Sequence, residues 1–145
     1  MTMAMAPQGK SKHCFHPHPF GGGLVAETAY VADTAYVATN ARVEEYARVL
    51  GHARILDNSR VREQAIVCGH ASILDDAVVR GCAHVTDLAS VRKSATIKGS
   101  SLLTDFCVVT DIATIEGRSF IGGHSTVRGN TLVKGDSTIK EGNPL

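Results

Sequence analysis

Branched aliphatic residues recur at every sixth position over most of the chain. From residue 23 to residue 142 the sequence divides into twenty consecutive six-residue units with no insertion or deletion. Position three of every unit is Val, Ile or Leu, and position one is small, most often Ala or Ser. A constant period of this kind is typical of stacked repeats, and it argues against a β-sandwich, whose turns vary in length.

Each unit predicts a short strand followed by a corner. Positions one and three point to one face of a strand, and positions two and four point to the other. The β-branched residues at position three suit a buried, pleated surface. Position five is usually Gly, Asp or Glu and position six is often Asn, Ser, His or Asp, which tolerate a sharp corner or a positive φ. A chain that turns by about 120° per unit closes a triangular coil of about 18 residues, with parallel strands about 4.8 Å apart.

The repeat resembles the hexapeptide-repeat family. The family pattern is an aliphatic residue, then Gly, Ala, Glu or Asp, two free positions, a small residue and one free position, as in ValAlaAspThrAlaTyr at 31–36. The resemblance implies an all-β fold, a single left-handed parallel β-helix, here of about seven triangular coils. The residues from Gly21 to Val25, followed by tandem Ala-x-Val units, look most similar to uncharacterised, non-catalytic bacterial and phage members. The family also contains acyltransferases and γ-class carbonic anhydrases, so the resemblance alone selects no function.

The two ends of the chain differ from the repeat. All four prolines lie outside it, as expected if every backbone N–H of the repeat is used in a strand ladder. We therefore divide the chain into an N-terminal tail, residues 1–22, and a β-helix, residues 23–145. A β-helix ends in strands with unpaired N–H and C=O groups. The tail is expected to be mobile, to cover its own first coil, or to reach the last coil of a neighbouring copy.

Composition narrows the classes of partner. The net charge of +1 and the 20% of charged residues lack the basic excess of nucleic-acid-binding or polybasic membrane proteins. The 43% of hydrophobic residues is too high for a disordered chain, yet no apolar run approaches the roughly 18 residues of a membrane span. We expect neither nucleic acid nor a membrane as a partner, and no cofactor. Because no signal peptide is recognisable and the four cysteines lack CxxC spacing, the cytoplasm is the default location.

One wall of the predicted coil is apolar on its outer side. A rod cannot bury outward residues in its own core, so exposed apolar patches indicate a partner, most simply a second copy of the chain. We expect lateral packing, for which the resemblance implies a trimer, or end-to-end filaments mediated by the tail. The residues expected to mediate assembly are Phe15, Phe20, Tyr30, Leu50, Ile66, Leu102 and Phe120. A second wall carries a mostly basic row from Arg42 to Lys134, which we interpret as a solvated face with pairing between coils.

Histidines provide the candidate chemistry. Three of them lie at one predicted corner, namely His52, His70 and His124. The acyltransferases of the family use a histidine general base, helped by a loop that leaves the coil or by a C-terminal helix, and this sequence shows neither. In the tail, a second group has ligand types suited to Zn²⁺, namely His13, Cys14, His16 and His18.

These observations predict a non-catalytic structural or assembly protein that self-associates. The first alternative is a hexapeptide-repeat acyltransferase with its active site between subunits. The second alternative is a metal-binding spike or display module that presents the tail.

Overall fold

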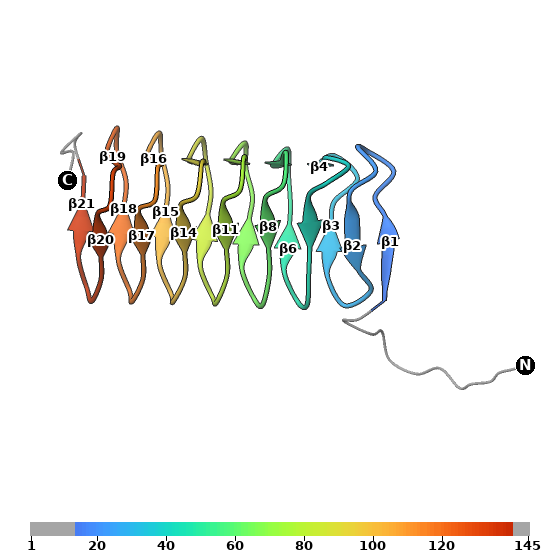
Figure 1. Cartoon of the computed structure of the whole chain (residues 1–145), viewed down its shortest axis with the longest axis horizontal. Coiled ribbons are helices and arrows are strands. Elements are labelled where there is room, and N and C mark those ends of the chain that lie inside the picture. Colours follow the sequence, from blue (N-terminus) through green and yellow to red (C-terminus); the bar gives the residue numbers. More distant parts are fainter. Residues whose placement is uncertain (1–13, 141–145) are drawn as a thin grey trace, which may run out of the picture.

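The computed structural model describes residues 14–140, which form one β-solenoid of short strands (Figure 1). Successive turns pair in parallel with a spacing of 18 residues, so that Val43 lies beside Val61 and Val61 beside Val79. Three sheets result, which we name walls 1, 2 and 3. The predicted all-β fold with stacked turns of 18 residues is confirmed.

The strands of the three walls alternate along the chain. Wall 1 consists of β1 (Phe15–Pro17), β2 (Leu24–Ala26), β5 (Arg42–Val43), β8 (Arg60–Val61), β11 (Val78–Val79), β14 (Thr96–Ile97), β17 (Thr114–Ile115) and β20 (Leu132–Val133). Wall 2 consists of β3 (Tyr30–Val31), β6 (Arg48–Val49), β9 (Ile66–Val67), β12 (His84–Val85), β15 (Leu102–Leu103), β18 (Phe120–Ile121) and β21 (Thr138–Ile139). Wall 3 consists of β4 (Tyr36–Val37), β7 (Arg54–Ile55), β10 (Ser72–Ile73), β13 (Ser90–Val91), β16 (Val108–Val109) and β19 (Thr126–Val127). The twenty strands β2–β21, at three per turn, make six complete turns and two further strands.

The core is a stack of aliphatic side chains at position three. All of these residues from Val25 to Ile139 are buried except Val31, which is half-buried. The small residues at position one are buried beside them in most units and leave space where the walls meet. The predicted division of inward and outward positions is therefore correct.

From Glu45 to Gly135, the corners share a positive φ at position five. Every position-five residue from Glu45 to Gly135 has a positive φ, between 56° and 74°. Glycine adopts this conformation without strain, and Asp tolerates it because its short side chain can bond to nearby backbone. The connections between β2 and β21 are three or four residues long, so no loop leaves the coil within the described part of the repeat.

The described part of the tail folds over the first coil. Strand β1 pairs with β2, and this is the one antiparallel pair among the described strands. Next to it, the Val37 N–H donates to the Phe20 carbonyl at 3.1 Å, and the Gly23 N–H donates to the Val37 carbonyl at 2.9 Å. We call residues 14–22 the N-terminal cap, because they cover the ends of β2 and β4.

Candidate functional site

Wall 2 is the least charged face of the solenoid. Its outward side chains are those at positions two and four, and among them only Arg48 and Lys140 carry a permanent charge. Along the row at position two, Ile66 pairs with the exposed His84, His84 with Leu102, and Leu102 with Phe120, so Leu102 and Phe120 are adjacent and one histidine separates them from Ile66. The wall residues predicted to mediate assembly all lie on wall 2, with Arg48 and His84 between some of them: Tyr30 is 55% exposed, and Leu50, Ile66, Leu102 and Phe120 are half-buried.

The two tail residues predicted to mediate assembly make contacts within their own chain. Phe15 packs against the core from β1, and the Arg42 guanidinium lies 5.6 Å from its ring centroid. Phe20 meets Tyr36 edge to face, with ring centroids 4.9 Å apart. Both aromatic rings therefore help to hold the cap on the first coil.

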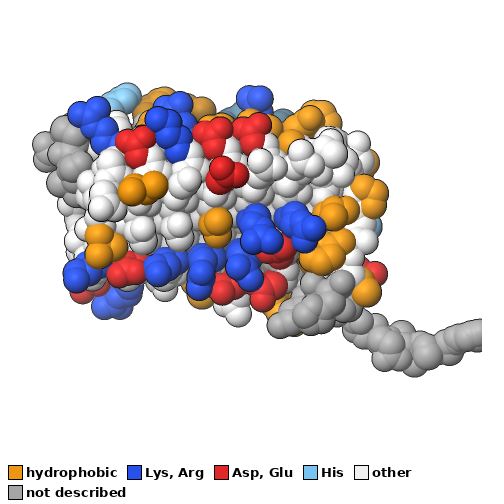
Figure 2. Space-filling model, viewed as in Figure 1, with side chains coloured by type: hydrophobic (Ala, Val, Ile, Leu, Met, Phe, Trp, Pro, Cys, Tyr) orange, Lys and Arg blue, Asp and Glu red, His pale blue; other side chains and the backbone are white. Residues whose placement is uncertain are grey.

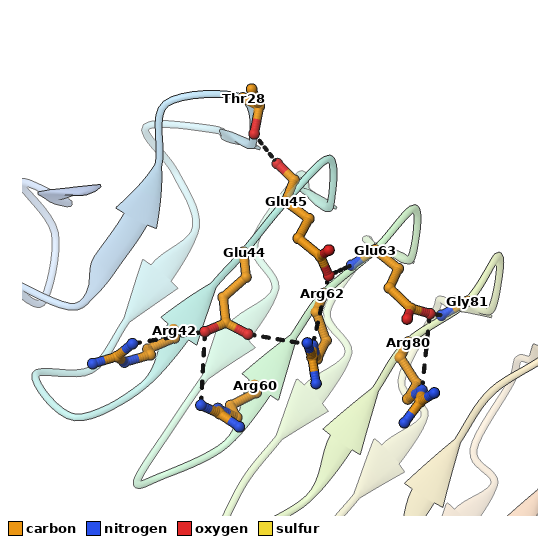
Figure 3. Close-up of polar contacts among 9 residues, drawn as sticks. All are labelled: Thr28, Arg42, Glu44, Glu45, Arg60, Arg62, Glu63, Arg80 and Gly81. Atoms are coloured by element: carbon orange, nitrogen blue, oxygen red, sulfur yellow. Dashed lines mark hydrogen bonds and ion pairs between the residues drawn. The ribbon is translucent and has the colours of Figure 1, made fainter. Parts of the chain in front are cut away.

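Wall 1 carries a charged network centred on Glu44 (Figure 3). The Glu44 side chain is only 11% exposed and lies between three guanidinium groups. Its carboxylate oxygens lie 3.7 Å from Arg42, 3.8 Å from Arg60 and 3.4 Å from Arg62. Arginine side chains from two successive coils thus converge on one acid, which supports the interpretation of this row as pairing between coils.

Charge is segregated between walls and corners. Among the described residues, eleven acids lie at positions five or six, and only Glu44 and Glu116 lie on a wall. Eleven Lys and Arg residues lie on the walls, and only Lys93 and Arg118 lie at corners. Rows of basic and acidic side chains accordingly run along the axis of the solenoid (Figure 2).

The corner carboxylates bond to the next coil. The Glu63 N–H donates to Glu45 Oε1 at 3.1 Å, and the Gly81 N–H donates to Glu63 Oε1 at 2.7 Å (Figure 3). At another corner, hydrogen bonds from the Thr104 hydroxyl and the Asp105 N–H lower the pKa of Asp87. Each of these acids accepts a hydrogen bond from a backbone N–H at the corner of the next turn. The negative charge of the carboxylate strengthens this hydrogen bond.

Similar bonding at a third corner lowers the pKa of Asp111. The Gly129 N–H donates to Asp111 Oδ2 at 2.9 Å, and the Lys93 ammonium donates to Oδ1 at 3.0 Å. The repeated acid at position five is the sequence signal for these hydrogen bonds between turns. Periodicity showed the corner but not the bond.

The three corner histidines do not form one group. His52 and His70 stack in parallel, with ring centroids 5.1 Å apart. His124 instead stacks on Phe106, with centroids 4.8 Å apart, and lies three turns from His70. The expectation that none of the three is catalytic stays untested, and they remain candidates only under the acyltransferase alternative.

The proposed metal ligands of the tail that the structure describes belong to the cap and differ in exposure. His13 lies outside the described residues. Cys14 and His16 are exposed, whereas His18 is buried, with its Nε2 3.0 Å from the Ala35 carbonyl. Within residues 14–140 no three His, Cys, Asp or Glu side chains are placed to hold a metal ion. A zinc site that uses His13 stays an untested alternative.

The cysteines of the solenoid differ in environment. Cys107 is fully buried at position one, and burial raises the pKa of its thiol to about 12. Cys68 is half-buried, and its thiol contacts the Thr86 hydroxyl at 3.2 Å. A thiol with a raised pKa is a poor nucleophile, so Cys107 serves packing.

A groove lies where the cap, wall 3 and the histidine corner meet. Its volume is about 510 Å³, and it opens to solvent. Its lining residues are Phe20, Thr34, Tyr36, His52, Arg54 and His70. Sequence reasoning missed this groove, because Phe20 belongs to the non-repeating tail and its docking beside Tyr36 follows no period.

Comparison with family models, with curated proteins and with solved structures found no match to this chain. Across residues 14–140 no helix has the length and apolar character needed to cross a membrane.

Proposed function

We propose that this protein is a non-catalytic structural module that self-associates laterally through wall 2. The proposal includes the left-handed coil and the kinship with hexapeptide-repeat proteins that the sequence resemblance implies. The observation that carries it is the low charge of wall 2, on which Arg48 and Lys140 are the only permanently charged outward residues. Walls 1 and 3 both carry more charge, and burying unpaired charge is costly.

The shape of wall 2 also supports lateral packing. Its strands are in register from β3 to β21, and the short corners leave no projection that would hold a second wall away. A flat face with few charges and several apolar side chains fits a second copy of the same face about a rotation axis. Contact between copies would remove Tyr30 and the half-buried apolar residues of the wall from water.

Paired charges on wall 2 test this proposal. The double substitution Ile66→Glu with Leu102→Glu places two carboxylates on the wall, two strands apart, without touching the core. The matched control is Ser72→Glu with Val108→Glu, which occupy the same positions on wall 3 with the same spacing. We expect the wild type and the control to sediment as oligomers and the wall 2 variant as a monomer of about 15.3 kDa.

Mass is measured by light scattering and sedimentation over a range of concentrations, and circular dichroism checks that each variant is folded. A wild type that remains monomeric at high concentration would contradict the proposal. Equal dissociation of both double variants would also contradict it, because the effect would then not belong to wall 2.

A further inference from the structure

We propose that the groove beside the N-terminal cap binds a small phosphate ester of an aromatic molecule, of the size of a nucleoside monophosphate. The groove volume of about 510 Å³ lies within the usual range of ligand pockets, roughly 300–1,000 Å³. The inference does not depend on self-association, because all lining residues come from one chain and none belongs to wall 2.

The groove gathers hydrogen-bond donors without an acid to balance them. Arg54 is exposed and forms no ion pair with any residue of 14–140, and none of the lining residues is Asp or Glu. This differs from wall 1, where Arg42, Arg60, Arg62 and Arg80 contact carboxylates (Figure 3). An unpaired guanidinium offers a planar fork of donors that matches phosphate oxygens.

The two stacked imidazoles add to this donor set. His52 and His70 lie on successive coils at one corner, and both are exposed. A neutral imidazole carries one N–H donor, and a protonated imidazole carries two, so the pair donates in either state. Arg54 lies two residues after His52, on β7, where the chain enters wall 3. The arrangement therefore favours one anionic group at this corner of the groove.

The part of the groove next to the cap is aromatic. Phe20 is 50% exposed and meets Tyr36 at an interplanar angle of 89°. An edge-to-face pair leaves part of the Phe20 ring surface open, where a flat ring can stack. Tyr36 pairs with Arg54 on the adjacent strand, so the aromatic side and the cationic side are joined by one strand pair. A ligand with an aromatic ring at one end and a phosphate at the other matches this arrangement of aromatic and cationic residues.

Titration of the full-length protein with three probes tests the inference. AMP has both the ring and the phosphate, adenosine lacks the phosphate, and inorganic phosphate lacks the ring. We expect AMP to bind saturably and to shift the ring signals of His52, His70 and Phe20 in NMR spectra. We expect adenosine and inorganic phosphate each to bind at least about tenfold more weakly than AMP, because adenosine loses the hydrogen bonds to the charged phosphate and inorganic phosphate loses the stacking on Phe20.

Three variants separate specific binding from general attraction. Arg54→Gln should weaken AMP binding by about tenfold and abolish the preference for AMP over adenosine. Arg48→Gln is the matched control, because Arg48 is also exposed at position two, forms no ion pair with a described residue and lies on wall 2. Phe20→Leu should reduce the affinity for AMP toward that for inorganic phosphate.

The absence of saturable AMP binding at millimolar concentration would overturn the inference. An equal loss of affinity in Arg48→Gln and Arg54→Gln would overturn it too, since it would indicate unspecific attraction to positive charge.

Discussion

Buried serines at position one show how a single residue fits both the space and the hydrogen bonding of this solenoid. The hydroxyls of Ser101, Ser119 and Ser125 donate to the carbonyl three residues earlier, at 2.9, 2.8 and 2.8 Å. Because a buried hydroxyl without a partner costs about 1–3 kcal/mol, this local bond is what lets Ser replace Ala in the core. The sequence showed that position one is small, but the acceptor became evident only with the corner geometry.

The burial of Val31 is a feature that the period of the sequence does not predict. Val31 occupies position three like the large aliphatic residues of the core, yet it is half-buried. It lies on β3, which is the end strand of wall 2 among the described residues and which the cap does not cover. Val25 and Val37, which the cap does cover, are 2% and 0% exposed. A repeat predicts which way a side chain points, whereas its burial also depends on a neighbouring turn.

Two adjacent residues on β8 test the inward and outward assignment. Val61 is fully buried, and Val61→Asp places a carboxylate without a partner among stacked aliphatic side chains. We expect a loss of several kcal/mol in the free energy of unfolding, or aggregation. Arg60→Asp introduces the same side chain on the exposed face, at a site whose contact with Glu44 is 3.8 Å long, and we expect a loss within about 1 kcal/mol. Urea unfolding measures both, and similar losses would contradict the assignment.

At the scale of the element, the corner links neighbouring turns. Its positive φ was predictable from the residues at position five, because Gly, Asp and Glu recur there. The bond from a corner carboxylate to the N–H of the next turn was not, because it requires the corners to stack in register. Lys93 is the one residue from Glu45 to Gly135 at position five that is neither glycine nor an acid, and its φ is 58°. Its N–H still bonds to Asp75 Oδ2 at 3.0 Å, so the backbone bond is kept at that turn.

Two corner glycines separate the cost of the φ angle from the cost of stacking. Gly99 and Gly135 lie at the same corner, with φ of 74° and 72°. A Cβ on Gly99 would lie 2.6 Å from the backbone N and O of Gly117, whereas a Cβ on Gly135 would have no neighbouring atom of residues 14–140 within 4 Å. Gly135→Ala should therefore cost only the conformational strain, about 1–2 kcal/mol. Gly99→Ala should cost at least about 1 kcal/mol more, because the turns must move apart.

Thermal and urea unfolding of the two glycine variants give the comparison directly. Equal losses would show that the stacked corners yield to an added methyl group without cost, and that the distance between turns is not fixed by the corner backbone.

At the scale of the whole molecule, the period of the sequence was sufficient to predict the solenoid, and the non-repeating part was not predictable in the same way. The repeat specifies one contact, that of each residue with the residue 18 further on, and this contact is reused from turn to turn. The cap and the groove depend on single contacts such as Phe20 with Tyr36 and His18 with Ala35. Nothing in the repeat indicates these contacts, so the sequence left open whether the tail covers its own first coil.

The position of the cap predicts how the ends of the solenoid behave. Residues 14–22 occupy the ends of β2 and β4, and β19, β20 and β21 have a strand neighbour on one side only within the described chain. Removing residues 1–22 uncovers strands that can continue the ladder of another copy, so we expect assemblies whose mass increases with concentration. We also expect the free energy of unfolding to fall by about 2 kcal/mol or more, because Val25 becomes exposed. The control is removal of residues 1–13, which retains the cap and should behave as the wild type in light scattering and electron microscopy. If the longer deletion keeps the wild-type mass at every concentration, then the cap does not limit end-to-end growth, and the three wall edges must be protected by their own geometry.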